Sequence, residues 1–281
     1  MVPVLIVGCG DIGRRVGALW RQRGVPVTAL TRRPDAQNAA DLDWRAVDLD
    51  APLAPHRVAG RLVYYFAPPP PQGTVDTRLR RWLAAAEGRA TRLVYLGTSG
   101  VYGDCGGAWV DESRSPAPAT DRGRRRLDAE HACEAWARRH DVPLTVLRVS
   151  AIYGPGRLPI GRLQRGEPVV RAAEAPWTNR IHADDLATAC MAAADAPPGI
   201  YNVSDDHPGT LPEYLDAVAD RLGLPRPPQI SLAEALAQAS PARREYLRES
   251  RRLCNRRLHD VLGVRLAYPS LAEGLRRLTP E

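Results

Sequence analysis

The feature that most constrains the fold of this chain lies at residues 4–13, which read VLIVGCGDIG. Four apolar residues in a row, three of them β-branched, predict a strand buried on both faces, as in a parallel sheet. The run then breaks into a Gly-x-Gly-x-x-Gly turn at Gly8, Gly10 and Gly13. Residues 14–20 follow with the apolar spacing of a helix, so the sequence predicts a strand, a tight turn and a helix in that order.

Glycines at this spacing, between a strand and a helix, are typical of dinucleotide binding. Gly8 allows the tight turn, and Gly10 lets a pyrophosphate approach the backbone with no side chain in the way. Gly13 lets the helix pack closely on the strand, and the helix N-terminus then faces the phosphate charge. Because the triplet follows the first strand of the chain, we interpret it as a cofactor site rather than as a structural turn alone.

A second strand is expected at residues 25–30, and two arginines, Arg32 and Arg33, follow its end where an acid could stand. An acid at this point binds the 2′-hydroxyl of NAD, whereas arginine accommodates the 2′-phosphate of NADP. Guanidinium groups also make bidentate contacts to phosphate. The sequence therefore favours NADP over NAD, and the alternative is that both arginines are solvated loop residues.

Further strands are expected at residues 44–49, 61–66 and 92–96, with a helix at residues 78–88. Asp48, near the end of the third strand, is placed to reach an adenine amino group. Strands that alternate with helical segments indicate an α/β fold with a doubly wound parallel sheet of the Rossmann type.

Length and composition narrow the class further. At 281 residues the chain can form one large α/β domain or a dinucleotide domain with a smaller partner. No apolar run approaches the roughly 20 residues that cross a membrane, and no charged leader precedes the first strand, so we expect neither a membrane segment nor a signal peptide. The cysteines lack any paired spacing, which predicts no disulfide framework, no metal site and a reducing, cytoplasmic location. They are Cys9, Cys105, Cys133, Cys190 and Cys254.

The formal net charge of +7 raises the question of nucleic-acid binding. All 39 Lys and Arg residues are Arg, and the chain has no Lys. We interpret this as compositional bias, and the densest clusters, at residues 122–126 and 243–257, as solvated faces of helices. The expected partner is therefore a small molecule or none, with no nucleic acid and no membrane.

Several short motifs follow one another along the chain. They are GTSGVYGD at residues 97–104, VDE at 110–112 with Pro116 and Pro118, LRVSAIYGPG at 147–156, RIHADDL at 180–186, YNV at 201–203, and Tyr268-Pro269 with EGL at 273–275. Together with the glycine turn, this set resembles the extended short-chain dehydrogenase/reductases, the NAD-dependent epimerase/dehydratase group, over nearly the whole chain. The resemblance implies a dinucleotide-binding domain at residues 1–155, to which residues 181–203 return, and a reduced C-terminal substrate lobe at residues 156–281. It also implies that Asp11, Ile12 and Ala67 join the glycines in binding the cofactor, and it is compatible with a homodimer.

The catalytic pair of that family is absent. Family members that transfer hydride use a Ser or Thr and a Tyr-x-x-x-Lys pair on a helix, in which the Tyr exchanges a proton with the substrate. The resemblance places Thr98 in the Ser/Thr role, Arg122 where the Tyr belongs and Arg126 where the Lys belongs. Arg126 can still bind ribose hydroxyls, but Arg122 cannot shuttle a proton because its guanidinium stays protonated. The chain therefore resembles an atypical subgroup that lacks the pair.

Other candidate acids are expected to be structural. By motif position, Tyr102 and Tyr153 are the phenols nearest the cleft, and we expect both to pack against the backbone. His182 stands in a structural landmark of the family, where Asp184 and Asp185 are expected to cap the following helix.

Two classes of function follow. The first is an NADP-dependent oxidoreductase or isomerase with Thr98 as its surviving hydroxyl and an unassigned acid. The second is a non-catalytic NADP-binding sensor or regulatory protein. Four of the arginines between residues 156 and 181 either bind an anionic substrate or are solvated; they are Arg157, Arg162, Arg165 and Arg171.

Overall fold

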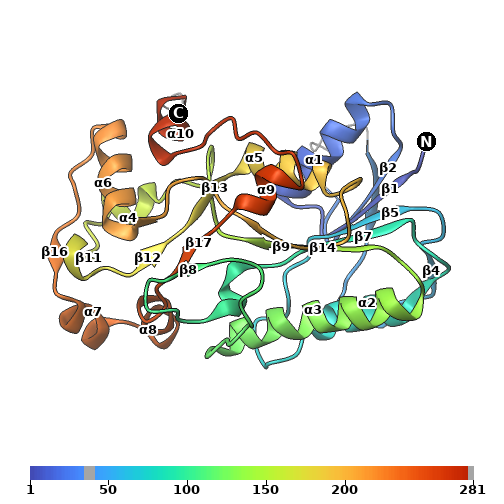
Figure 1. Ribbon diagram of the computed structural model, residues 1–281, viewed down its shortest axis with the longest axis horizontal. Coiled ribbons are helices and arrows are strands. Elements are labelled where there is room, and N and C mark those ends of the chain that lie inside the picture. Colours follow the sequence, from blue (N-terminus) through green and yellow to red (C-terminus); the bar gives the residue numbers. More distant parts are fainter. Residues whose placement is uncertain (35–41, 278–281) are drawn as a thin grey trace.

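A seven-stranded parallel sheet forms the centre of the protein in the computed structural model, which describes residues 1–34 and 42–277 (Figure 1). Its strands, from one edge to the other, are β3 (Asp43–Ala46), β2 (Val27–Thr31), β1 (Val4–Val7), β5 (Leu62–Tyr65), β7 (Arg92–Leu96), β9 (Leu144–Val149) and β14 (Gly199–Val203). Every neighbouring pair is parallel, so the prediction of a Rossmann-type sheet is confirmed.

Helices cover both faces of this sheet. On one side lie α1 (Asp11–Gln22) and α5 (Ala183–Ala192), and on the other lie α2 (Thr77–Ala85) and α3 (Asp121–Arg139) (Figure 1). Successive residues of β1 point to opposite faces, so Ile6 packs in the core under α1 and α5 while Val7 packs in the core under α2 and α3. This two-sided burial is the reason that the first strand is a continuous apolar run.

Two elements end earlier than expected. The strand predicted at residues 44–49 ends at Ala46, and Val47, Asp48 and Leu49 instead line a cavity. The helix predicted at residues 78–88 ends at Ala85, because the next two residues form β6 (Ala86–Glu87) and pair with β4 (His56–Arg57).

A second, smaller lobe has apolar cores of its own. Its elements are α4 (Ile160–Gln164), β11 (Val169–Val170), η2 (Ala172–Glu174), β12 (Trp177–Thr178), β15 (Gly209–Thr210), α6 (Leu211–Leu222), β16 (Gln229–Ile230), α7 (Leu232–Gln238), α8 (Pro241–Leu247) and α10 (Leu271–Arg276). In Figure 1 this lobe lies beside the strand ends β9 and β14, at the opposite end of the molecule from β4.

The chain crosses between the lobes more than once. β10 (Ala151–Tyr153) pairs with β13 (Arg180–His182), and the chain then continues through α5 to the edge strand β14. β17 (Arg252–Leu253) pairs with β8 (Trp109–Val110), and α9 (Arg256–Asp260) packs on β14. Leu258, Leu262 and Val264 thereby join the core of the main sheet, a return that the sequence did not indicate. Within the described residues, no helix combines the length and the apolar character needed to cross a bilayer.

Candidate functional site

The site lies at the carboxyl ends of the sheet strands. The strand order reverses between β1 and β5, because β1 leads outward to β2 and β3 while the later strands continue on its other side. In open α/β sheets, ligands bind in the crevice at such a point. Two cavities line this edge, one at the ends of β1, β2, β3 and β5 and one at the ends of β7 and β9.

The glycine turn after β1 has the geometry that a pyrophosphate needs. Gly8 has φ +83°, and a Cβ there would lie 2.4 Å from the backbone N and Cα of Ala67, so no other residue fits without displacing that loop. A Cβ on Gly10 would meet no atom within 4 Å, so open space faces the backbone at this residue. Gly10 is the N-cap of α1 and supplies no side-chain hydrogen bond to the first turn. The backbone N–H groups in the first turn of α1, together with the open space at Gly10, fit a bound phosphate group.

The cavity beside this turn has a volume of about 240 Å³ and suits the adenosine half of a dinucleotide. Of the residues predicted to bind the cofactor, it is lined by Gly8, Gly10, Arg32, Asp48 and Ala67. Arg33 is exposed and stands outside this wall.

Arg78, which was not predicted from the sequence, lines the adenosine cavity from α2. Its guanidinium is held by Asp50, with an Nη2–Oδ2 distance of 2.5 Å, and it donates hydrogen bonds to the carbonyls of Pro68 and Pro69. No pattern in the sequence around Arg78 predicts that it lies near the end of β3, because only the tertiary packing of α2 brings Arg78 and that segment together.

Asp11, in the first turn of α1, connects the two lobes. Its carboxylate accepts hydrogen bonds from Arg15 at 3.0 Å and from Arg157, in the loop after β10, at 2.6 Å. Burial alone would raise the pKa of Asp11, but these two guanidinium groups hold it below its ordinary value. The other two predicted residues of the turn pack inward: Ile12 is buried, and a Cβ on Gly13 would lie 3.0 Å from the Cys9 sulfur.

The larger cavity has a volume of about 570 Å³ and contains the predicted catalytic residue Thr98. Thr98 follows β7 and is the N-cap of η1 (Ser99–Tyr102), where its hydroxyl accepts a hydrogen bond from the Gly100 N–H at 3.2 Å. The first turn of α3 forms the neighbouring wall, and a Cβ on Gly123 would lie 3.2 Å from the Gly100 carbonyl oxygen. This close approach places Arg122 beside Thr98.

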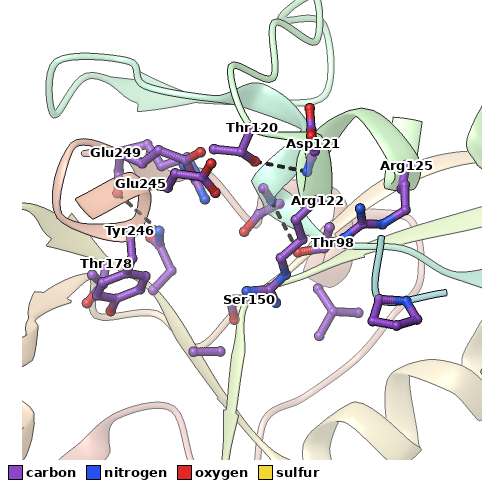
Figure 2. A pocket seen from close by; sticks show the side chains of 18 of the residues that line it. Thr98, Thr120, Asp121, Arg122, Arg125, Ser150, Thr178, Glu245, Tyr246 and Glu249 are labelled. Carbon is purple, nitrogen blue, oxygen red and sulfur yellow. Dashed lines mark hydrogen bonds and ion pairs between the residues drawn. The ribbon is translucent and has the colours of Figure 1, made fainter. Parts of the chain in front are cut away.

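The arginines of residues 122–126 differ in their surroundings. Figure 2 shows Arg122 pointing into the cavity toward Thr98 and Ser150. Arg125 is 7% exposed, lines the same cavity and donates to the Gly73 carbonyl, so the expectation of a solvated helix face is wrong for this residue. Arg126 donates to the Leu96 carbonyl and lies over the Tyr95 ring, outside the walls of both cavities.

Several further residues of the larger cavity were not indicated by the sequence. Ser150 comes directly after β9, and Glu245, Tyr246 and Glu249 come from α8 and the loop that follows it. In Figure 2, Tyr246 lies beside Thr178, across the cavity from Thr98. Among the residues that line the cavities in the described part of the chain, Tyr246 is the only tyrosine.

A buried ion pair joins β9 to α3, two residues before Ser150 in the chain. Arg148 on β9 donates to Glu130 on α3, with an Nη2–Oε2 distance of 2.8 Å, and the two side chains are only 3% and 6% exposed. Burial by itself lowers the pKa of Arg148, but the hydrogen bonds and charge of Glu130 raise it above its ordinary value.

The remaining candidate acids are structural. The buried Tyr102 hydroxyl donates to Asn202 Oδ1 at 2.8 Å, and that of Tyr153 donates to the Ser270 carbonyl at 3.3 Å. His182 itself is the N-cap of α5, because its Nδ1 accepts from the Asp184 N–H at 3.2 Å. The prediction that the two acids cap this helix is therefore wrong: Asp184 pairs with Arg15, and Asp185 accepts from the backbone N–H groups of residues 267 and 268.

The four arginines predicted as candidates at residues 157–171 are all paired with carboxylates and line neither cavity. Their partners are Asp11 for Arg157, Glu167 for Arg162 and Arg165, and Glu174 for Arg171.

The fold, the glycine turn and the crevice at the strand ends define a Rossmann-type dinucleotide-binding protein. Residues 74–204 match the model of the NAD dependent epimerase/dehydratase family. This match covers a little under half of the chain, and together with the fold shared with a protein that binds NAD it confirms the resemblance predicted from the motifs.

Two solved structures are similar over nearly their full length. A functionally unknown conserved protein from Silicibacter pomeroyi is 30% identical, with a TM-score of 0.78 and coverage of 98% of this chain and 97% of the other. MoeE5, in complex with UDP-glucose and NAD, is 26% identical, with a TM-score of 0.77 and coverage of 98% and 96%.

Two sequence relatives differ in the share of their own length that aligns with this chain. A 3-diazoavenalumate denitrifying reductase from Streptomyces is 29% identical over 98% of this chain and 99% of its own length. An uncharacterized protein of Sinorhizobium fredii is 30% identical over 45% of this chain, which spans about a third (34%) of that protein.

Proposed function

We propose that the protein is an NADP-dependent reductase of a small molecule, and that the carbon accepting the hydride needs no proton from a tyrosine. One observation carries this proposal: Arg122 occupies the wall beside Thr98, where the family resemblance places the catalytic Tyr. A guanidinium stays protonated at any physiological pH and so cannot serve as the proton donor.

When bound, the reduced nicotinamide would supply a hydride. A carbonyl carbon that accepts hydride becomes an alkoxide, which must then be protonated. An acceptor that already carries a positive charge, such as an iminium or an aryl diazonium, is neutralised by the hydride and needs no proton. In the diazonium case a C–H bond forms, the C–N bond breaks and N₂ leaves with its electron pair. Supporting this second type of acceptor, the Streptomyces relative is a denitrifying reductase of a diazo compound and is matched over 99% of its length.

The residues of the larger cavity would divide the work of binding such a substrate. The Thr98 hydroxyl would orient the reacting part of the molecule. The Glu245 carboxylate also lines this cavity and has no ion-pair partner among residues 1–34 and 42–277, so it would attract a positively charged acceptor.

The preference for NADP rests on the adenosine cavity. Arg32 lines this cavity, where its guanidinium would meet the 2′-phosphate, and residues 31–34, the part described after the buried stretch of β2, include no acid to hold a 2′-hydroxyl. A charge-assisted hydrogen bond contributes roughly 1.5–3 kcal/mol, or about tenfold or more in affinity. We expect Arg32→Ala with Arg33→Ala to abolish the preference and to leave NAD affinity almost unchanged in calorimetric titrations.

Arg45→Ala is the matched control for this pair, because Arg45 is an exposed arginine of β3 that pairs with Asp43 outside the cavity. Equal affinity of the unmodified protein for NAD and NADP would overturn the assignment of the two arginines.

Turnover is tested by following NADPH absorbance with three kinds of acceptor: a carbonyl, an iminium and an aryl diazonium. We expect turnover with a cationic acceptor, and transfer of deuterium from [4-²H]NADPH to the product carbon in mass spectra. Gly10→Ala serves as the control for direct reaction in solution, since a side chain there would block the pyrophosphate approach.

Turnover confined to carbonyls would contradict the proposed acceptor. No turnover with any acceptor, despite tight NADP binding, would instead support the non-catalytic sensor.

Restoring the missing pair tests the role of Arg122 in reverse. Arg122→Tyr together with Arg126→Lys supplies a phenol and a compact ammonium, so we expect the double variant to gain reduction of a simple carbonyl. Arg122→Tyr alone should not gain it, because the Arg126 guanidinium remains committed to the Leu96 carbonyl. Carbonyl reduction by the single variant would contradict this reasoning.

A further inference from the structure

We infer that Arg122 and Ser150 form a subsite for a carboxylate group of the substrate. The inference rests on the proposed function only in placing a small-molecule substrate in the larger cavity. It assigns the substrate class, a small carboxylic acid with a flat apolar body, which the reaction type alone does not specify.

Arg122 differs from the other arginines around it. Arg124 pairs with Asp121 at 2.9 Å, whereas Arg125 and Arg126 donate to backbone carbonyls. The Arg122 side chain has no hydrogen bond or ion pair in the part of the chain that the structure describes. Its guanidinium lies in the cavity with all of its N–H donors available, beside Thr98 and Ser150 (Figure 2).

Ser150 supplies an independent sign of a missing ligand. The residue is 9% exposed, and its Oγ is shielded from solvent with no hydrogen-bond partner among the described residues. Its position is fixed, because its own N–H donates to the Val203 carbonyl at 3.0 Å. Buried hydroxyls nearly always have a partner, so an unpaired one in a cavity wall points to a ligand that accepts or donates there.

A carboxylate satisfies both groups at once. It presents acceptor lone pairs on two oxygens, so it can take two parallel hydrogen bonds from a guanidinium and one more from a hydroxyl. The first turn of α3, which carries Arg122, adds the positive end of a helix dipole of 19 residues. A neutral amide of the same shape would lose the charge attraction and meet the guanidinium with one acceptor oxygen only.

The rest of the cavity indicates the body of the molecule. A volume of about 570 Å³ is in the range of small-molecule sites. Trp177 lines the cavity and is 37% exposed, and the Arg252 guanidinium, which does not line the cavity, lies 5.1 Å from the Trp177 ring and 5.4 Å from the Trp109 ring. An indole fixed in this way offers a flat surface on which a planar apolar group can stack.

The test measures binding and needs no turnover. Cinnamate and its neutral isostere cinnamamide are titrated calorimetrically into the full-length protein in the presence of saturating NADP⁺. We expect cinnamate to bind at least about tenfold more tightly than cinnamamide. Arg122→Gln should remove most of this ratio, and Ser150→Ala should reduce it by a few fold.

Arg124→Gln is the matched control, because it removes a charge two residues away that is exposed and outside the cavity. It should leave the ratio unchanged, and unaltered NADP⁺ affinity in every variant shows that the fold is intact. Equal binding of the two probes by the unmodified protein, or an unchanged ratio in Arg122→Gln, would overturn the subsite.

The outcome is separable from that of the proposed reaction. A charge-dependent ratio without any hydride transfer would leave the subsite standing and remove the reductase. Hydride transfer to acceptors that carry no carboxylate, at rates unaffected by Arg122→Gln, would support the reductase and remove the subsite.

Discussion

Replacing Glu130 by Gln should destabilise the protein far more than its size suggests. The Glu130–Arg148 pair has side-chain exposures of 6% and 3%, and Arg148 also lies 4.7 Å from the Tyr102 ring. Glutamine keeps the shape and removes the charge, so the guanidinium stays buried without a counter-ion. Removing one partner of a buried pair typically costs about 3–5 kcal/mol.

The corresponding change in Tm follows from the size of the chain. Unfolding entropy is about 2.1 cal/mol/K per residue, so for 281 residues a loss of 3–5 kcal/mol lowers Tm by roughly 5–8 °C. Urea denaturation followed by tryptophan fluorescence and circular dichroism measures the free energy of unfolding directly. An unchanged m-value would show that the native and unfolded states keep their compactness.

Two variants make this prediction decisive. Glu134→Gln removes the same charge one turn later on α3, from an exposed pair with Arg138, and should cost less than about 0.5 kcal/mol. Glu130→Leu with Arg148→Met removes both charges and should be nearly neutral, since the cost comes from an uncompensated ion rather than from the lost attraction. A cost below about 1 kcal/mol for Glu130→Gln, or a double variant as unstable as the single one, would refute the reasoning.

Three further predictions concern the turn, a buried acid and the surviving hydroxyl. Gly8→Ala should lower the free energy of unfolding by roughly 2–5 kcal/mol, because the new Cβ would lie 2.4 Å from Ala67 at φ +83°. Gly10→Ala should keep the Tm of the unmodified protein and lose dinucleotide affinity in calorimetry. Equal Tm values for the two variants would contradict this prediction. Burial raises the pKa of Asp205 to about 7, so the folded state binds the extra proton and stability falls as pH rises from about 4 to 7. Asp205→Asn should remove up to about 4 kcal/mol of this dependence, seen as Tm against pH, and an identical profile would exclude the assignment. Thr98→Val should lower turnover strongly with little change in cofactor affinity, at a stability cost of about 1 kcal/mol for the lost cap; unchanged turnover would remove Thr98 from the site.

Local patterns determined the dinucleotide half of this protein. The apolar run of residues 4–7 specifies a strand buried on both faces, and the glycine spacing after it specifies a tight turn, in which Gly8 adopts φ +83°. The family motifs carried the same information for the parallel sheet and for the position of Thr98. These features are readable because each depends on residues within a few positions of one another.

Only the tertiary structure decided what stands opposite Thr98. The substitution at Arg122 is visible in the sequence, but its unpaired state depends on which carboxylates pack nearby. Ser150 lies beside Arg122 because β9 ends at this edge of the cavity. Glu245 and Tyr246 belong to α8, more than 90 residues further along the chain. Similarly, His182 rather than the acids after it caps α5, because Asp184 and Asp185 are drawn to Arg15 and to the segment before α10. The physical reason is that a charged side chain pairs with whatever the folded chain brings within hydrogen-bond distance, and sequence separation does not limit that choice.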